Sequence, residues 1–166
     1  AMECGMPYVT LRWIGGTLTN FNTIKTRVGH FIDLLKKQES GELKKYTKKE
    51  QSEFNKEIEA LRRKFEGLVT LTKMPSAIFL MDIRQESTAL AEAKKRNIPV
   101  IAVCDTNVDP KEIDYVIPAN DDAVKSVELM VEFVAESFKE GQKLQGAREQ
   151  MKKIQEEKVV EKEEEK

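Results

Sequence analysis

Residues 8–24 read Tyr-Val-Thr-Leu-Arg-Trp-Ile-Gly-Gly-Thr-Leu-Thr-Asn-Phe-Asn-Thr-Ile, and this stretch decides the fold. Its first half is rich in β-favouring residues, which predicts a strand over residues 8–13. The pair Gly15-Gly16 then ends the strand, because glycine adopts positive φ and admits a second backbone closely. Thr19 and Asn20 follow as turn and N-cap residues, which predicts that a helix begins here.

Two interpretations of this bend remain open from the sequence. A glycine bend followed by hydroxyl and amide side chains at a helix start is typical of sites that bind phosphate through backbone N–H groups. An ordinary connection between a strand and a helix has the same composition. Arg12 and the single tryptophan, Trp13, lie just before the glycines and fit both interpretations.

Charge is unevenly distributed along the 166 residues, although the net charge is only −1. Residues 1–64 carry thirteen Lys/Arg and eight Asp/Glu, whereas residues 65–138 carry seven and thirteen. A basic first section followed by an acidic second section predicts that only the first faces a polyanion.

Apolar residues recur with helical spacing in two arms that flank the polar segment 38–47. They are Ile24, Val28, Phe31 and Leu35 in the first arm, and Phe54, Ile58, Leu61 and Phe65 in the second. Thr47 and Glu50 have the spacing of a capping box at the start of the second arm. The pattern predicts an antiparallel coiled-coil hairpin inserted at residues 24–67. Its paired lysines are too dense for i,i+4 acids to neutralise, which favours a nucleic-acid contact over a merely solvated coiled coil.

Beyond Gly67 the chain has the pattern of an α/β domain, which we assign to residues 1–23 and 68–140. Apolar runs at 77–81, 100–104 and 115–117 do not alternate, so they predict parallel strands covered on both faces. Helices are predicted at 87–96 and from 120–122 onward. The inward stripe expected for the second helix is Val124, Val127, Val131, Val134 and Phe138. Residues 141–166 alternate Lys and Glu and predict a frayed helix or disordered tail.

Asp82, Asp105 and Asp109 follow two of the predicted strands. Carboxylates at this edge of a sheet can hold Mg²⁺, so a Mg²⁺-dependent phosphohydrolase or nucleotide-binding enzyme is the alternative function. Turn and helix-start roles explain the same residues without a metal. The chain also lacks a glycine-rich nucleotide loop, so neither a catalytic residue nor a metal or cofactor is expected.

The cysteine and histidine content limits the class of protein further. With two cysteines, Cys4 and Cys104, and one histidine, His30, no zinc site can be built. Cys104 lies in an apolar run and is expected to be a buried thiol. No apolar run has membrane-spanning length and no secretory leader is visible. We therefore expect a cytoplasmic protein whose cysteines are reduced. We also expect this sequence to be a gene fragment that begins inside a domain.

Several motifs, in order, resemble the protein S2 family of the small ribosomal subunit, in its bacterial or organellar form. They are Arg12-Trp-Ile-Gly-Gly-Thr-Leu-Thr-Asn-Phe21, Asp82-Ile-Arg84, Asn97-Ile-Pro-Val-Ile-Ala102, Asp105-Thr-Asn107 with Asp109-Pro110, and Ile113-Asp-Tyr-Val-Ile-Pro118 with Asn120-Asp-Asp122. The likeness covers about residues 3–140. It implies a Rossmann-like, flavodoxin-type three-layer parallel sheet with the hairpin inserted. It also implies that an N-terminal part of the domain is missing, which leaves a sheet face or edge uncovered.

The resemblance implies a structural, non-catalytic role on the ribosome in translation. The expected partners are small-subunit rRNA and neighbouring small-subunit proteins, including the large mRNA-binding one, without a membrane. Trp13 and Tyr46 are candidates for stacking on bases, with core packing as the alternative for Trp13. The expected RNA-binding residues are Arg12, Trp13, Gly15, Gly16, Thr19, Asn20, Lys25, Arg27, Lys36, Lys37, Lys44, Lys45, Lys48 and Lys49.

Overall fold

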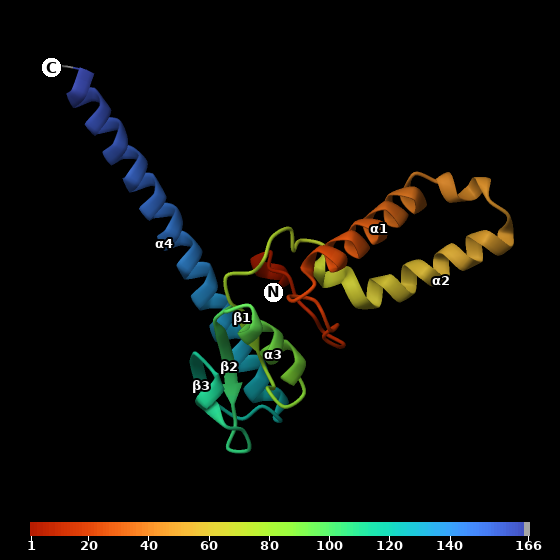
Figure 1. The fold of residues 1–166 in the computed structure, drawn as a ribbon, viewed down its shortest axis with the longest axis horizontal. Helices are drawn as coiled ribbons and strands as arrows, with labels where there is room; N and C mark the ends of the chain where they lie inside the picture. The colour runs from red at the N-terminus through yellow and green to blue at the C-terminus, as the bar shows by residue number, and fades with distance from the viewer. Residues whose placement is uncertain (165–166) are drawn as a thin grey trace.

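The structure is a computed structural model that describes the backbone of residues 1–164 and the side chains of residues 1–148 and 151. It consists of a small α/β body with two projections (Figure 1). A helical hairpin extends from one side of the body, and a long C-terminal helix extends from the other. Among the described residues, no helix has the length and apolar character needed to cross a membrane.

The body contains a parallel sheet of three strands in the order β1-β2-β3. Strand β1 spans Ile78–Leu80, β2 spans Val100–Cys104 and β3 spans Tyr115–Pro118. Ile78 pairs with Val100, and Ile101 pairs with Tyr115. The three apolar runs therefore form the predicted strands, and the α/β class is confirmed.

Helix α3, Ser87–Lys95, covers one face of this sheet. Its Ala89, Leu90 and Ala93 are buried, as predicted, against Val100 and Ala102 of β2. Together with Leu18 they form the larger part of what we call the body cluster. Cys104 belongs to this cluster as a buried free thiol, also as predicted. Burial, with a smaller effect of the Asp121 charge, raises the pKa of the thiol.

The hairpin consists of helix α1, Phe21–Glu39, the 3₁₀ helix η2, Glu42–Lys45, and helix α2, Lys48–Phe65. The capping box at Thr47 is formed, because Thr47 and Glu50 bond each other's backbone N–H groups. The buried residues form what we call the hairpin cluster: Ile24, Val28, Phe31, Leu34, Leu43, Ile58, Phe65 and Leu68. Leu34 is buried more deeply than the predicted Leu35, which packs partly at the margin with Phe54 and Leu61.

The predicted strand over residues 8–13 is not formed. The chain here has no regular secondary structure, and Tyr8 donates its N–H to the Gly67 carbonyl at 2.9 Å. Strand-forming residues need a neighbouring strand, since β propensity reflects packing against cross-strand partners. In the described part of the chain the sheet pairs only β1, β2 and β3, so this segment has no strand beside it.

Helix α4 spans Val124–Glu164 and so begins two residues beyond the predicted start at 120–122. The Asn120 Oδ1 atom accepts the N–H groups of Asp122 and Ala123 at 3.0 and 2.7 Å. The predicted inward stripe is wrong at Val124, Val131 and Phe138, which are exposed. The helix runs far past a body that is too small to cover it (Figure 1). Residues 141–164 are helical, and the last two residues lie outside the described part.

Three short 3₁₀ helices complete the described structure: η1, Met2–Cys4; η3, Glu66–Leu68; and η4, Pro110–Glu112. The first packs beside α4, where Lys139 Nζ lies 3.1 Å from the Glu3 carboxylate. This contact lowers the pKa of Glu3 and raises that of Lys139.

Candidate nucleic-acid interface

Residues 13–19, which we call the joint, connect the body with the hairpin. Trp13 and Leu18 pack in the body cluster, whereas Ile14 packs against the hairpin cluster. The buried members of the two clusters are different residues. The stretch that decides the fold is therefore the place where two separate hydrophobic cores are joined.

The joint is held by one carboxylate, that of the buried Glu92 in α3. Glu92 accepts the backbone N–H groups of Gly16, Leu18 and Thr19 at 2.6, 2.8 and 3.1 Å. It also accepts the Thr19 hydroxyl at 3.2 Å and the Trp13 indole N–H at 3.3 Å. Gly16 has a φ of 94°, a conformation that favours glycine. The bend is thus an anion-binding loop that the protein's own carboxylate fills.

Arg96, just after α3, holds the other side of the same peptide groups. Its Nε donates to the Leu18 carbonyl at 3.1 Å, and its Nη2 donates to the Thr19 carbonyl. Glu92 and Arg96, which we call the clamp, therefore bind the donors and the acceptors of the joint. Bonds that involve a charged partner are stronger than those between neutral groups.

The pKa of Glu92 reflects two opposing effects. Burial alone would raise the pKa, but the bonds from Gly16, Leu18, Thr19 and Trp13 together outweigh burial and lower it. A lowered pKa in the folded state stabilises the fold at every pH above the ordinary value, which is about 4.3. This contribution is lost as the pH falls through the folded-state pKa.

The structure places the expected binding residues of the bend in different roles. Trp13 packs partly in the core, as the alternative interpretation predicted. Asn20 is the N-cap residue of α1, but its side-chain Oδ1 atom accepts the Thr23 hydroxyl at 2.8 Å and makes no hydrogen bond to a backbone N–H group of the helix. Arg12 and Gly15 are exposed.

Sequence reasoning missed both residues of the clamp. Glu92 and Arg96 are four residues apart beside Ala93, which was predicted to face inward. Residues four apart lie on the same side of a helix, and this spacing is the feature of the sequence that could have identified the pair.

The cations of the hairpin are exposed and largely without acidic partners. Among the described residues, no ion pair involves Lys25, Arg27, Lys36, Lys37, Lys44, Lys45, Lys48 or Lys49. The hairpin pairs that do form join His30 to Glu57 at 3.0 Å and Arg62 to Glu59 at 3.4 Å. Near the tip, the Glu50 carboxylate instead accepts the Thr47 N–H and hydroxyl, which lower its pKa.

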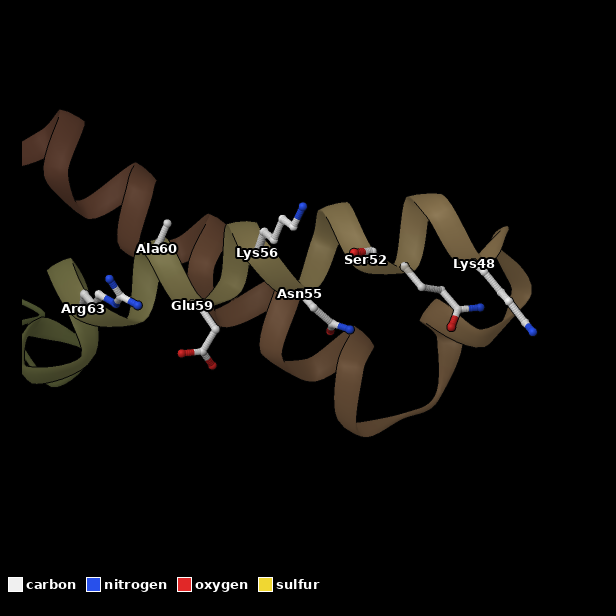
Figure 2. A pocket seen from close by; sticks show the side chains of 8 residues that line it. Lys48, Ser52, Asn55, Lys56, Glu59, Ala60 and Arg63 are labelled. Atoms are coloured by element: carbon white, nitrogen blue, oxygen red, sulfur yellow. The ribbon is translucent and has the colours of Figure 1, made fainter.

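The outer side of α2 extends this basic region away from the tip. A shallow hollow of about 770 Å³ runs along the helix, lined by Lys48, Gln51, Ser52, Asn55, Lys56, Glu59, Ala60 and Arg63 (Figure 2). All eight residues come from α2, and small side chains separate the long ones. Three cations, two amides and a hydroxyl suit a sugar–phosphate backbone, which offers both phosphates and hydroxyl groups, although the Glu59 carboxylate also lies in this lining.

The carboxylates of the alternative enzyme hypothesis have structural roles. Asp82 accepts the N–H groups of Arg84 and Gln85, and Asp105 accepts that of Thr106. Asp109 caps η4 by accepting the Lys111 N–H at 3.0 Å. These are the turn and helix-start roles that the sequence left open.

Oxygens of Asp105, Asp121 and Asp122 lie within 4.8 Å of one another, a group to which Asp109 does not belong. Desolvation, followed by the charges of Asp82, Asp122 and Asp105, raises the pKa of Asp121. Asp105 and Asp121 are half-buried and Asp122 is exposed, and this is not the set of carboxylates that the enzyme hypothesis required.

The family model for ribosomal protein S2 matches residues 1–141. The chain belongs to the ribosomal protein S2 family. It is 41% identical over 152 residues to the small ribosomal subunit protein uS2 of Endomicrobium trichonymphae, which covers 92% of this chain. The chain spans 62% of the length of that relative. The predicted family is confirmed, and this family is not enzymatic, which disfavours the phosphohydrolase alternative.

Proposed function

We propose that this chain is a structural constituent of the small ribosomal subunit that binds its rRNA through the basic hairpin. The observation that carries the proposal is the set of exposed lysines around the tip that have no acidic partner among the described side chains. Charges left uncompensated in the free protein are available to phosphates. Membership in a small-subunit family supports rRNA as the polyanion that the hairpin binds.

Recognition by the hairpin would be mainly electrostatic. Lysines meet phosphates as point charges and fix the register of the protein without distinguishing bases. Tyr46 is 42% exposed, and its ring meets Phe54 edge to face with centroids 5.2 Å apart. Held in this way beside four lysines, the Tyr46 ring is placed to stack on an unpaired base.

At the bend, the proposed contact is narrower than the sequence alone indicated. The backbone N–H groups of Gly16 and Thr19 are bonded to Glu92, so they are not free to bind phosphate. Arg12, Gly15 and Asn20 are exposed, as are Lys25 and Arg27 near the start of α1, and these five remain our proposed contacts there.

We also propose the finer fold and the neighbours that the resemblance implies. Parallel strands in chain order, β1-β2-β3, fit one half of a flavodoxin-type sheet, in which strands on one side of the switch point follow the sequence. The described strands would then belong to a Rossmann-like three-layer domain of the family. Adjacent small-subunit proteins, including the large mRNA-binding one, are the proposed protein partners.

The salt dependence of RNA binding tests the hairpin. Changing Lys44, Lys45, Lys48 and Lys49 together to Gln removes four phosphate-binding charges. The slope of log K against log salt is negative, and its magnitude should decrease by about 3, because each phosphate contact contributes roughly 0.7–0.9. Filter binding to small-subunit rRNA at several salt concentrations measures this slope.

The matched control changes Lys73, Lys95, Lys111 and Lys125, which are exposed lysines outside the hairpin, to Gln. Net charge falls equally in both variants, so only position differs. We expect the control to retain nearly the whole slope. An unchanged slope in the tip variant would exclude the tip from the RNA interface.

A further inference from the structure

We propose that the clamp, Glu92 and Arg96, fixes the direction in which the hairpin leaves the body. These would be positioning residues for the RNA binding proposed above, on which this inference partly rests. They touch no RNA themselves. Their effect would be to present the basic tip and α2 in one orientation.

The two hydrophobic clusters are separate, so packing alone does not fix the hairpin on the body. A shared core would fix the hairpin by packing alone, but the buried residues of the body and of the hairpin form distinct groups. The body instead holds the joint by burying Leu18, which is only 1% exposed. The orientation of α1 therefore depends on the few residues between Leu18 and the start of α1 at Phe21, together with the second connection of the hairpin through η3.

The geometry of the clamp restrains the backbone of the joint on two sides. Glu92 fixes the N–H groups of Gly16, Leu18 and Thr19, and Arg96 fixes the carbonyls of Leu18 and Thr19. A rotation in this segment that swings α1 must break several of these bonds together. Within the joint, the Thr17 hydroxyl donates to the Ile14 carbonyl at 2.6 Å, and the Asn20 N–H donates to the Gly16 carbonyl at 2.8 Å.

The carboxylate of Glu92 suits a site that is lined with hydrogen-bond donors. A carboxylate only accepts, and its two oxygens here meet five donors. Glutamine has the same shape but carries an NH₂ group, which in either orientation would face at least one backbone N–H donor, and among these five partners only the Thr19 hydroxyl could accept from it. Glu92→Gln should therefore release one side of the joint with little change in packing volume.

The orientation can be measured without RNA. Spin labels at Ser40→Cys beside the tip and Asn107→Cys in the body report the distance between the two parts, with Cys4→Ser and Cys104→Ala as background. We expect one narrow distribution in this background, and at least a twofold increase in its width for Glu92→Gln and for Arg96→Gln. The matched control, Glu112→Gln, removes an exposed carboxylate that pairs with Lys94 of α3 at 3.2 Å and should leave the width unchanged.

A purely stabilising role would lower the melting temperature without widening the distribution of the folded protein. Unchanged widths in both clamp variants would overturn the proposal. If Glu92→Gln does not fold, Arg96→Gln decides alone, because Arg96 is an exposed residue whose loss removes bonds but no core packing.

RNA binding gives the second readout. Because every cation of the hairpin is retained, the clamp variants should bind small-subunit rRNA about fivefold more weakly, with an unchanged salt slope. A widened distribution with unchanged affinity would overturn the positioning role in RNA binding. If the proposed function is wrong, the result is distinguishable, because the variant with Lys44, Lys45, Lys48 and Lys49 changed to Gln would then keep the salt slope of the unmodified chain.

Discussion

Phe31→Ala should lower the free energy of unfolding by about 3–5 kcal/mol, the usual cost of deleting a buried aromatic ring. Phe31 is 1% exposed and lies in the hairpin cluster between α1 and α2. Two helices alone form a thin core, so the hairpin has little material with which to fill the cavity. Chemical denaturation followed by far-UV circular dichroism measures the loss.

The control is Phe133→Ala, which removes the same side chain from a site on α4 that is 54% exposed. It should change the unfolding free energy by no more than about 0.5 kcal/mol. Equal losses at the two positions would contradict the assignment of Phe31 to a buried core. We also expect only Phe31→Ala to weaken RNA binding, because it disorders the surface that carries the lysines.

Gly67→Ala is expected to cost about 1–3 kcal/mol or more, as overpacking does in a site without free space. A Cβ atom at Gly67 would lie 2.2 Å from the Tyr8 carbonyl oxygen and 2.7 Å from the Tyr8 ring. The first of these atoms belongs to the backbone, so a rotamer change cannot relieve the clash. The Tyr8 N–H bond to the Gly67 carbonyl should be lost as the two segments separate.

Gly29→Ala provides a control with the opposite sign. Gly29 lies inside α1, and a Cβ atom there would meet nothing within 4 Å. Alanine in a helix interior should raise stability by roughly 1 kcal/mol relative to glycine. Thermal unfolding of both variants makes the comparison, and shifts in the same direction would contradict the close contact at Gly67.

The parts of the fold that the sequence predicted correctly depend on local patterns. Helical spacing of apolar residues identified the two arms of the hairpin, and the Thr47–Glu50 pair marked the start of the second arm. Continuous apolar runs identified the three strands, since strands of a parallel sheet are usually buried on both faces. The predicted burial is correct for β2 but wrong for β3, where Tyr115 and Val116 are exposed. Each of these signals lies within a short window of the chain.

The parts that failed depend on what lies beside a segment. Residues 8–13 have strand composition, but a strand forms only where another strand pairs with it. The stripe on α4 has helical spacing, yet Val124 is 70% exposed, and no residue of α4 belongs to the body cluster. Glu92 bonds to Gly16 across 76 residues of sequence, a contact that no local pattern reveals.

The bend illustrates the same limit. Its glycines and hydroxyls correctly indicated a loop that binds an anion through backbone N–H groups. They did not indicate which anion, because the carboxylate comes from a helix far along the chain. The structure joins the two interpretations, since the bend is an anion-binding loop and also the connection between body and hairpin.

The central claim is that the chain assembles into small ribosomal subunits through its basic hairpin, and sedimentation tests it most directly. The tagged chain is expressed in bacteria, and the lysate is separated on a density gradient at low and at high salt. We predict that the chain migrates with small subunits at low salt and is released as the salt concentration rises. A folded chain that remains in the free protein fractions at low salt would contradict the account.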